Sequence, residues 1–154
     1  MMSAVATIPP FELFYVEHRD EVFRYLRRLL GGEAEDAFQE TFLRALRGYG
    51  KLEHGRHLRA WVFTIATRVA LDTRRRQPPA TEAPAVASTD ERPAYAELEH
   101  LVSELPPTER AAVVLRYGYD FPYTEIGAAL GSSEDAARQA ASSGVRRLRR
   151  KELP

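Results

Sequence analysis

Apolar side chains recur every three or four residues along most of this chain, which is the spacing of one face of an α-helix. Three such stripes precede residue 77, and the first ends at a helix-stopping pair, Gly31 and Gly32. The stripes are Phe11, Phe14, Val22, Tyr25, Leu26 and Leu29; Ala34, Phe38, Thr41, Phe42 and Ala45; and Leu58, Trp61, Val62, Ile65 and Val69. Polar residues fill the opposite sides, and on the third helix we place Arg59, Thr67, Arg68 and Arg74 outside.

The stretch that follows these helices has the composition of a linker. Residues 77–93 contain four prolines and mostly small side chains, with almost nothing large to bury. No segment of the chain shows the sustained two-residue alternation of a strand. The sequence therefore predicts an all-α protein of two small helical domains, residues 8–76 and 98–152, joined by a flexible Pro/Ala-rich linker over residues 77–97.

The carboxy-terminal domain has the spacing of short helices joined by a tight turn. Pro106 and Pro107 predict a helix start, and Ala111, Val114 and Leu115 supply its apolar face. Tyr123, Ile126 and Leu130 line the next helix, Gly131 suits a left-handed helix end, and Ser132 with Asp135 predicts the following cap. In the last helix Ala137, Ala141, Gly144 and Leu148 form one face, and Arg138, Ser142, Arg146 and Arg149 form the other. This is the pattern of a helix-turn-helix that reads DNA, although a plain pair of packed helices has similar spacing.

Charge is balanced overall but divided along the chain. The chain has 22 Lys and Arg against 22 Asp and Glu among its 154 residues, so nucleic-acid binding has to be argued from local clusters. Basic residues cluster at two places, residues 74–76 and 146–151. Each cluster can also be explained as a solvated helix end. No apolar run is long enough to cross a bilayer and the start has no secretion-signal pattern, so we expect a cytoplasmic protein without membrane insertion.

Catalytic and metal chemistry find no support in the sequence. The chain has no cysteine, which excludes disulfides, thiol nucleophiles and cysteine metal sites. His54 and His57 lie near Glu53, but spacing positions no further ligand beside them. There is no glycine-rich phosphate loop and no nucleophile elbow. We therefore expect no metal, no cofactor and no enzymatic activity.

Two blocks of residues carry a family resemblance. The first is residues 35–45, EDAFQETFLRA, continued by residues 58–68, LRAWVFTIATR, and a basic tail over 72–76. The second comprises residues 105–117, then YTEIG at 123–127 and Leu130 with Gly131. In this order the chain resembles the extracytoplasmic-function (ECF) sigma factors, two-domain specificity subunits of bacterial RNA polymerase. The blocks are similar to regions two and four of that family and, with the linker, cover nearly the whole chain.

The resemblance implies partners and residue roles. The helix with the first block would dock on core RNA polymerase, which makes core-contact candidates of Asp36, Gln39, Glu40 and Arg44. The following loop and helix would open the minus-ten promoter element, with Lys51, Arg56, Arg59 and Arg68 as DNA-binding candidates and Tyr49 nearby. Trp61 lies in the apolar stripe, so we expect it in the core. The resemblance also allows an anti-sigma factor to wedge between the two domains.

The chain departs from the family pattern at three places. Arg68 stands where many members carry an asparagine that helps to define the captured base, and Pro122 replaces the common cap residue. The resemblance implies that the helix-turn-helix reads the minus-thirty-five element, which lies upstream of the minus-ten element. Its predicted recognition helix is rich in alanine, so the DNA-binding candidates there reduce to Arg138, Gln139, Ser142 and Arg146. Two other interpretations stay open: a free-standing helix-turn-helix regulator, and a sigma-like protein that binds polymerase or an anti-sigma factor with weakened promoter reading.

Overall fold

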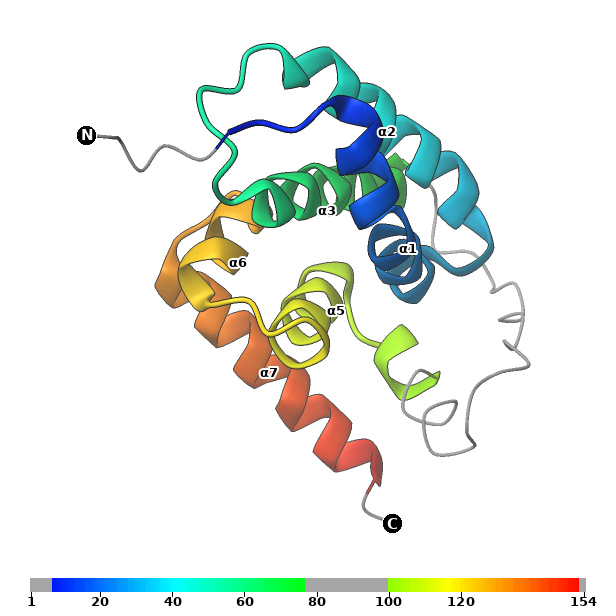
Figure 1. Ribbon diagram of the computed structural model, residues 1–154. Coiled ribbons are helices and arrows are strands. Elements are labelled where there is room, and N and C mark those ends of the chain that lie inside the picture. Colours follow the sequence, from blue (N-terminus) through cyan, green and yellow to red (C-terminus); the bar gives the residue numbers. More distant parts are fainter. Residues whose placement is uncertain (1–6, 77–99, 153–154) are drawn as a thin grey trace.

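The computed structural model describes residues 7–76 and 100–152, and in these residues the protein is helical with no strand (Figure 1). The first half contains α1 (Phe11–Leu30), α2 (Ala34–Tyr49) and α3 (Leu58–Arg76), with a short 3₁₀ turn at Gly31–Glu33. The second half contains α5 (Pro107–Val113), a π-helical turn at Val114–Gly118, α6 (Tyr123–Leu130) and α7 (Glu134–Glu152). The all-α prediction is confirmed, and the predicted linker over 77–97 lies outside the described residues.

An aromatic cluster holds the first three helices together. Phe14 of α1 is fully buried, and its ring centroid lies 6.1 Å from that of Phe42 on α2 and 5.8 Å from that of Trp61 on α3. The Tyr49 ring packs on the same side chain at 5.2 Å, and its hydroxyl donates to the Pro9 carbonyl at 2.5 Å. Trp61 thus packs against the core, as expected.

Thr67 was predicted to lie on the outer side of α3, and that prediction is wrong. Its side chain is fully buried, and its Oγ1 donates to the Phe63 carbonyl at 2.7 Å. Because that bond uses the only hydroxyl proton of Thr67, the buried Tyr25 hydroxyl, 2.6 Å away, must be the donor to Thr67. Burial raises the pKa of Tyr25, so the phenol stays protonated and keeps donating.

Close approaches of backbone shape the second half. Gly131 ends α6 in the left-handed conformation, with φ 71°, as predicted. Gly127 and Gly144 leave no room for a side chain, because a Cβ would lie 2.7 Å from the Ser133 carbonyl oxygen and 2.6 Å from a Val113 methyl group, respectively. The cap of α7 is Ser133, whose Oγ accepts from the Ala136 amide at 3.0 Å, so the predicted cap at Ser132 is wrong by one residue.

The two halves pack against each other in the structure. α6 lies along α3, and α5 lies against the ends of α1 and α3 (Figure 1). Phe63 of α3 is buried between Tyr25 of its own half and Tyr119 and Phe121 of the other half, with ring centroids 5.1 to 5.2 Å away. The helix α3 is therefore covered on two sides, by α1 and α2 of its own half and by α6 of the other half.

We expect Thr67→Val to lower the free energy of unfolding by about 1 to 3 kcal/mol, because it leaves the buried Tyr25 hydroxyl without an acceptor. Chemical denaturation followed by circular dichroism measures the effect. Thr73→Val is the matched control: its hydroxyl bonds only the carbonyl of Val69, on its own helix, at 2.8 Å. That control should stay within about 0.5 kcal/mol of the parent, and equal losses in both variants would contradict the assigned bond.

We also expect stability to fall on acidification because of His18. Its side chain is buried beside Phe14, and burial lowers the pKa of His18 below its ordinary 6.5 despite nearby Glu17 and Glu21. The unfolded chain then binds a proton before the folded chain does, so the free energy of unfolding decreases as pH drops below about 6.5.

The measurement is urea unfolding between about pH 7.5 and 5.5. His18→Gln should show a shallower decrease, whereas His100→Gln, at an exposed position, should retain the parent slope. An unchanged slope in His18→Gln would rule out this histidine as the source.

Candidate polymerase-binding and DNA-binding surfaces

The outward side of α2 carries the four residues predicted to contact core polymerase. Asp36 and Gln39 are exposed, while Glu40 and Arg44 are half-buried and joined by a bond of 2.7 Å from Nε to the carboxylate. This hydrogen bond lowers the pKa of Glu40. The helix turns all four toward the side opposite the buried stripe, so the structure brings the predicted set together.

Two leucines in the same surface were missing from the predicted set. Leu43 and Leu46 are 48% and 53% exposed, although both are large and apolar. Leu43 lies one helical turn after Gln39, and Leu46 lies one turn after Leu43, so the two leucines interrupt a polar face. Exposed apolar residues rimmed by polar ones are typical of protein interfaces. The signal was in the sequence, since both leucines fall outside the buried stripe of the helix.

Arg59 is the most heavily engaged of the predicted DNA-binding residues. Its guanidinium makes two bonds to Glu21 of α1, at 3.0 and 2.9 Å, and donates to the Tyr119 carbonyl at 3.1 Å. It also lies over the Phe121 ring, 4.4 Å from the centroid. The hydrogen bond to Glu21 is the main reason that the pKa of Arg59 is raised. Arg59 is therefore held in place by partners from both halves.

The other predicted minus-ten residues are more accessible. Lys51 and Arg56 are exposed in the loop before α3, and Arg68 is exposed on α3 itself. Arg68 donates to the Ala128 carbonyl, in the last turn of α6, at 3.1 Å. Tyr49 lies in the aromatic cluster of the core and not beside these cations as a free ring.

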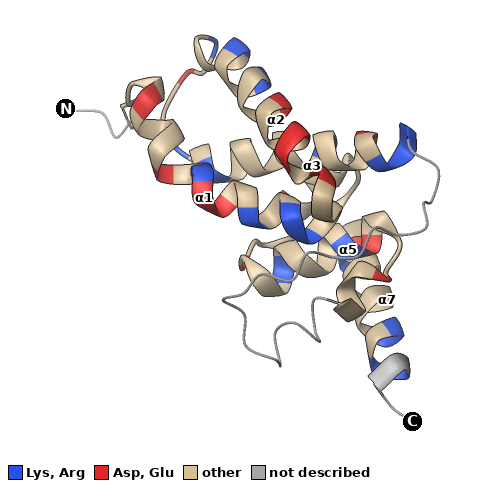
Figure 2. Ribbon diagram, turned by 90° about the vertical axis from the view of Figure 1, so that its right-hand side faces the viewer, with Lys and Arg blue, Asp and Glu red and all other residues tan. Residues whose placement is uncertain are grey.

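The predicted recognition helix α7 presents all four of its candidates near or at the surface. Arg138, Gln139, Ser142 and Arg146 are exposed on one side of it. Arg138 bonds Glu134 at 3.1 Å and lies 4.8 Å from the centroid of the Tyr123 ring. Its guanidinium therefore already has partners within the chain before any DNA binds. Basic residues gather at the carboxy-terminal ends of α3 and α7 (Figure 2). The candidates thus form separate surfaces on α2, on α3 with the loop before it, and on α7.

Groups of metal-ligating side chains and membrane-spanning helices are both absent from residues 7–76 and 100–152. No group of three or more metal-ligating side chains comes together there, and His54 accepts a hydrogen bond from the Arg56 amide. None of the helices described is long and apolar enough to cross a membrane.

Known proteins with similar sequences and folds define the family. The sigma-70 region 2 family matches residues 14–78, and the sigma-70 region 4 family matches residues 101–150. The RNA polymerase sigma factor CarQ of Myxococcus xanthus is 34% identical over 151 residues, 90% of this chain and 87% of CarQ. The ECF RNA polymerase sigma factor SigE of Mycolicibacterium smegmatis is 34% identical over 160 residues, 94% of this chain and 62% of that protein.

A solved structure shows the same fold. The sigma factor RpoE of Bartonella quintana, crystallised with the anti-sigma factor NepR, matches with a TM-score of 0.72 at 20% identity, covering 91% of this chain and 94% of that one. A helical domain followed by a helix-turn-helix is the arrangement of a sigma-70-type transcription initiation factor. This chain belongs to the ECF RNA polymerase sigma factors within that class. Sigma factors bind core RNA polymerase and promoter DNA, and the free-standing regulator is not favoured.

Proposed function

We propose that this chain docks on core RNA polymerase through the outward face of α2. The observation that carries the proposal is the pair of exposed leucines, Leu43 and Leu46, set among Asp36, Gln39, Glu40 and Arg44. An apolar centre with a polar rim supplies both buried area and orientation in a complex. The Glu40 to Arg44 pair is already formed, so little side-chain freedom is lost there on binding.

The promoter contacts that we propose divide between the two domains. Lys51, Arg56, Arg59 and Arg68 would meet the backbone and opened bases of the minus-ten element, since phosphate contacts dominate affinity. Arg138 and Gln139 lie in the first turns of α7, where a recognition helix meets base edges. Ser142 and Arg146 lie further along and would contact the backbone. Between Ala136 and Gly144 the polar side chains of α7 are limited to Arg138, Gln139, Ser142 and Ser143, so recognition of the minus-thirty-five element is weak.

The remaining assignments follow from this role. The chain acts in the cytoplasm, where polymerase and promoter are, and performs no catalysis of its own. Its partners are core polymerase, promoter DNA and an anti-sigma factor. The last proposal is supported by the solved relatives, which were crystallised as complexes of RpoE with NepR and of CnrH with the cytosolic domain of CnrY.

We expect Leu43→Ser with Leu46→Ser to weaken binding to bacterial core polymerase about tenfold or more, because the apolar centre of the docking face is lost. The test is co-elution on a sizing column at moderate salt, with affinity from fluorescence titration. The matched control is Leu13→Ser with Val16→Ser, two side chains of α1 with similar exposures of 60% and 56%. Equal losses in both double variants, or none in the first, would refute the proposed face.

We expect Arg138→Ala with Gln139→Ala to lower transcription from promoters that depend on an upstream element about tenfold, because base-edge contacts are lost. Promoters with a strong minus-ten element and no upstream requirement serve as the control templates, and their output should change little. The same loss on every template would instead indicate a general electrostatic or folding defect. Runoff transcription with purified core polymerase gives both readouts.

A further inference from the structure

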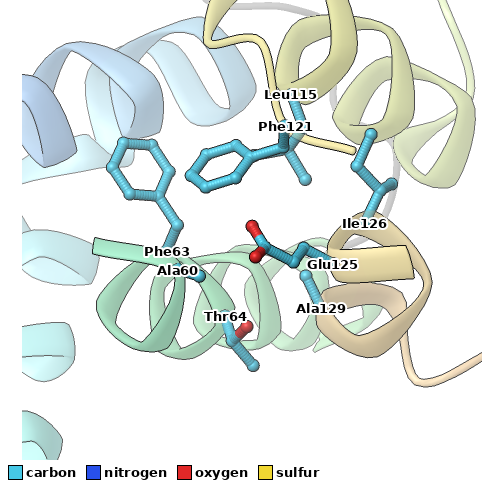
Figure 3. A pocket seen from close by; sticks show the side chains of 8 residues that line it. All are labelled: Ala60, Phe63, Thr64, Leu115, Phe121, Glu125, Ile126 and Ala129. Carbon is cyan, nitrogen blue, oxygen red and sulfur yellow. The ribbon is translucent and has the colours of Figure 1, made fainter. Parts of the chain in front are cut away.

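Two hollows in the described part of the chain differ in what they can hold. The first lies between α3 and α6 and has a volume of about 10 Å³, which is room for about one water molecule. Phe63, Phe121 and Ile126 are among the side chains that line it (Figure 3). The second lies where α2 meets the carboxy-terminal end of α3 and has a volume of about 280 Å³. Of these two, only the second has room for a ligand.

The second hollow is lined by charged side chains, and we refer to it as the arginine hollow. Its lining consists of Arg44 of α2 and of Asp72, Arg75 and Arg76 of α3. The basic end of α3 is visible in Figure 2. Among the described residues no apolar side chain contributes to the lining. A compact anion without an apolar part is therefore the kind of ligand that suits it.

Most of the hydrogen-bond donors in the arginine hollow are unused. Arg44 donates its Nε to Glu40 at 2.7 Å, and Arg75 donates to Asp72. In the described part of the chain Arg76 donates to no protein group. Because a guanidinium has five N–H donors, each of the three arginines keeps several for an anion.

Positive charge also surrounds the hollow. Arg47 is exposed on α2, one turn before the end of that helix. The hydrogen bond from Arg44 is the main cause of the lowered pKa of Glu40, and the charges of Arg47 and Arg76 lower it further, so both lie near this carboxylate. Asp72 is the one lining residue that opposes an anion. A ligand with several negative charges is therefore attracted more strongly than a singly charged one.

Phosphate chemistry fits this arrangement. The planar fork of a guanidinium pairs with phosphate through two parallel hydrogen bonds, and three such forks at one hollow can engage more than one phosphate group. A single carboxylate brings only one negative charge. Successive phosphates of a DNA strand are separated by a sugar, so a DNA backbone presents one phosphate at a time. Two directly linked phosphate groups supply both the charge and the acceptors.

The arginine hollow shares one residue with the polymerase-docking face of α2. Arg44 is half-buried, and its guanidinium lies between the Glu40 carboxylate and the hollow. An anion in the hollow competes with Glu40 for this guanidinium. Glu40 and Arg44 both belong to the proposed polar rim around Leu43 and Leu46, so the competition changes the docking face.

We propose that the arginine hollow binds a ligand with two adjacent phosphate groups, and that the bound ligand draws Arg44 away from Glu40 and so weakens docking on core polymerase. The second part rests on the proposed docking face of α2, whereas the first part concerns the free chain. Because coupling between two sites is reciprocal, core polymerase weakens binding of the ligand by the same factor.

The first test is calorimetric titration of the free full-length chain with inorganic pyrophosphate, at fixed ionic strength and without divalent cations. We expect saturable binding with a Kd below about 1 mM, and binding about tenfold or more weaker in Arg75→Gln with Arg76→Gln. The matched control is Arg149→Gln with Arg150→Gln, two adjacent exposed arginines near the end of α7. It should keep the parent affinity. No saturable binding by the parent, or equal losses in both double variants, would overturn the site.

A second variant should bind more tightly, which loss of structure cannot imitate. Asp72→Asn removes the opposing charge and frees Arg75, so we expect pyrophosphate affinity to rise about threefold or more. Asp135→Asn is its control, since Asp135 pairs with Arg138 at the same three-residue spacing, 3.5 Å away on α7, and should leave the affinity unchanged. Unchanged or weaker binding in Asp72→Asn would overturn the site.

Two further ligands define the phosphate chemistry. Inorganic phosphate should bind about tenfold or more weaker than pyrophosphate, because one group reaches fewer guanidiniums, and equal affinity would overturn the requirement for two groups. Adenosine diphosphate distinguishes the sources of the paired phosphates. Affinity similar to that of pyrophosphate identifies the end group of a nucleotide, and much weaker binding identifies the inorganic ion.

The coupling is tested by fluorescence titration of the labelled chain with core polymerase, with saturating pyrophosphate or with potassium chloride at equal ionic strength. We expect pyrophosphate to weaken core binding of the parent about threefold or more and to leave Arg75→Gln with Arg76→Gln unchanged. That variant also controls for pyrophosphate bound by the polymerase itself. No weakening, or equal weakening in parent and variant, would overturn the coupling. If the parent fails to bind core polymerase in either salt, the proposed function fails while the calorimetric result on the free chain stands.

Discussion

Burial of α3 on two sides is the constraint on which the rest of this structure depends. A helix covered on one side needs one apolar stripe, whereas α3 meets α1 and α2 on one side and α6 on another. Small residues, Ala66 and Ala70, allow close approach, and Phe63 fills the space where the halves meet. Thr67 and Tyr25 satisfy each other at the centre, so a polar pair fixes the rotation of α3 against α1. That rotation decides which cations face outward.

The arginines divide into structural and surface groups for the same reason. Arg59 bonds Glu21 of its own half and the Tyr119 carbonyl of the other half, and Arg147 of α7 bonds Glu109 of α5 at 2.7 Å, so both arginines join separate elements of the fold. Arg74 and Arg110 are turned toward the end of α1, where the last carbonyls of a helix favour cations. Lys51, Arg56 and Arg146 lie exposed. Counting the basic residues of a cluster in the sequence therefore overestimates how many of them are available to contact DNA.

Local pattern was sufficient to predict the helices and the face of α2, because each depends on residues within one or two turns. The αL end at Gly131 and the outward side of α7 followed from the same short-range rules. Thr67, Ser133 and the engagement of Arg59 could not be predicted in this way. A buried threonine looks like an exposed one until its partner, 42 positions away, is known. Contact between the halves depends on packing across the linker, which has no periodic signal.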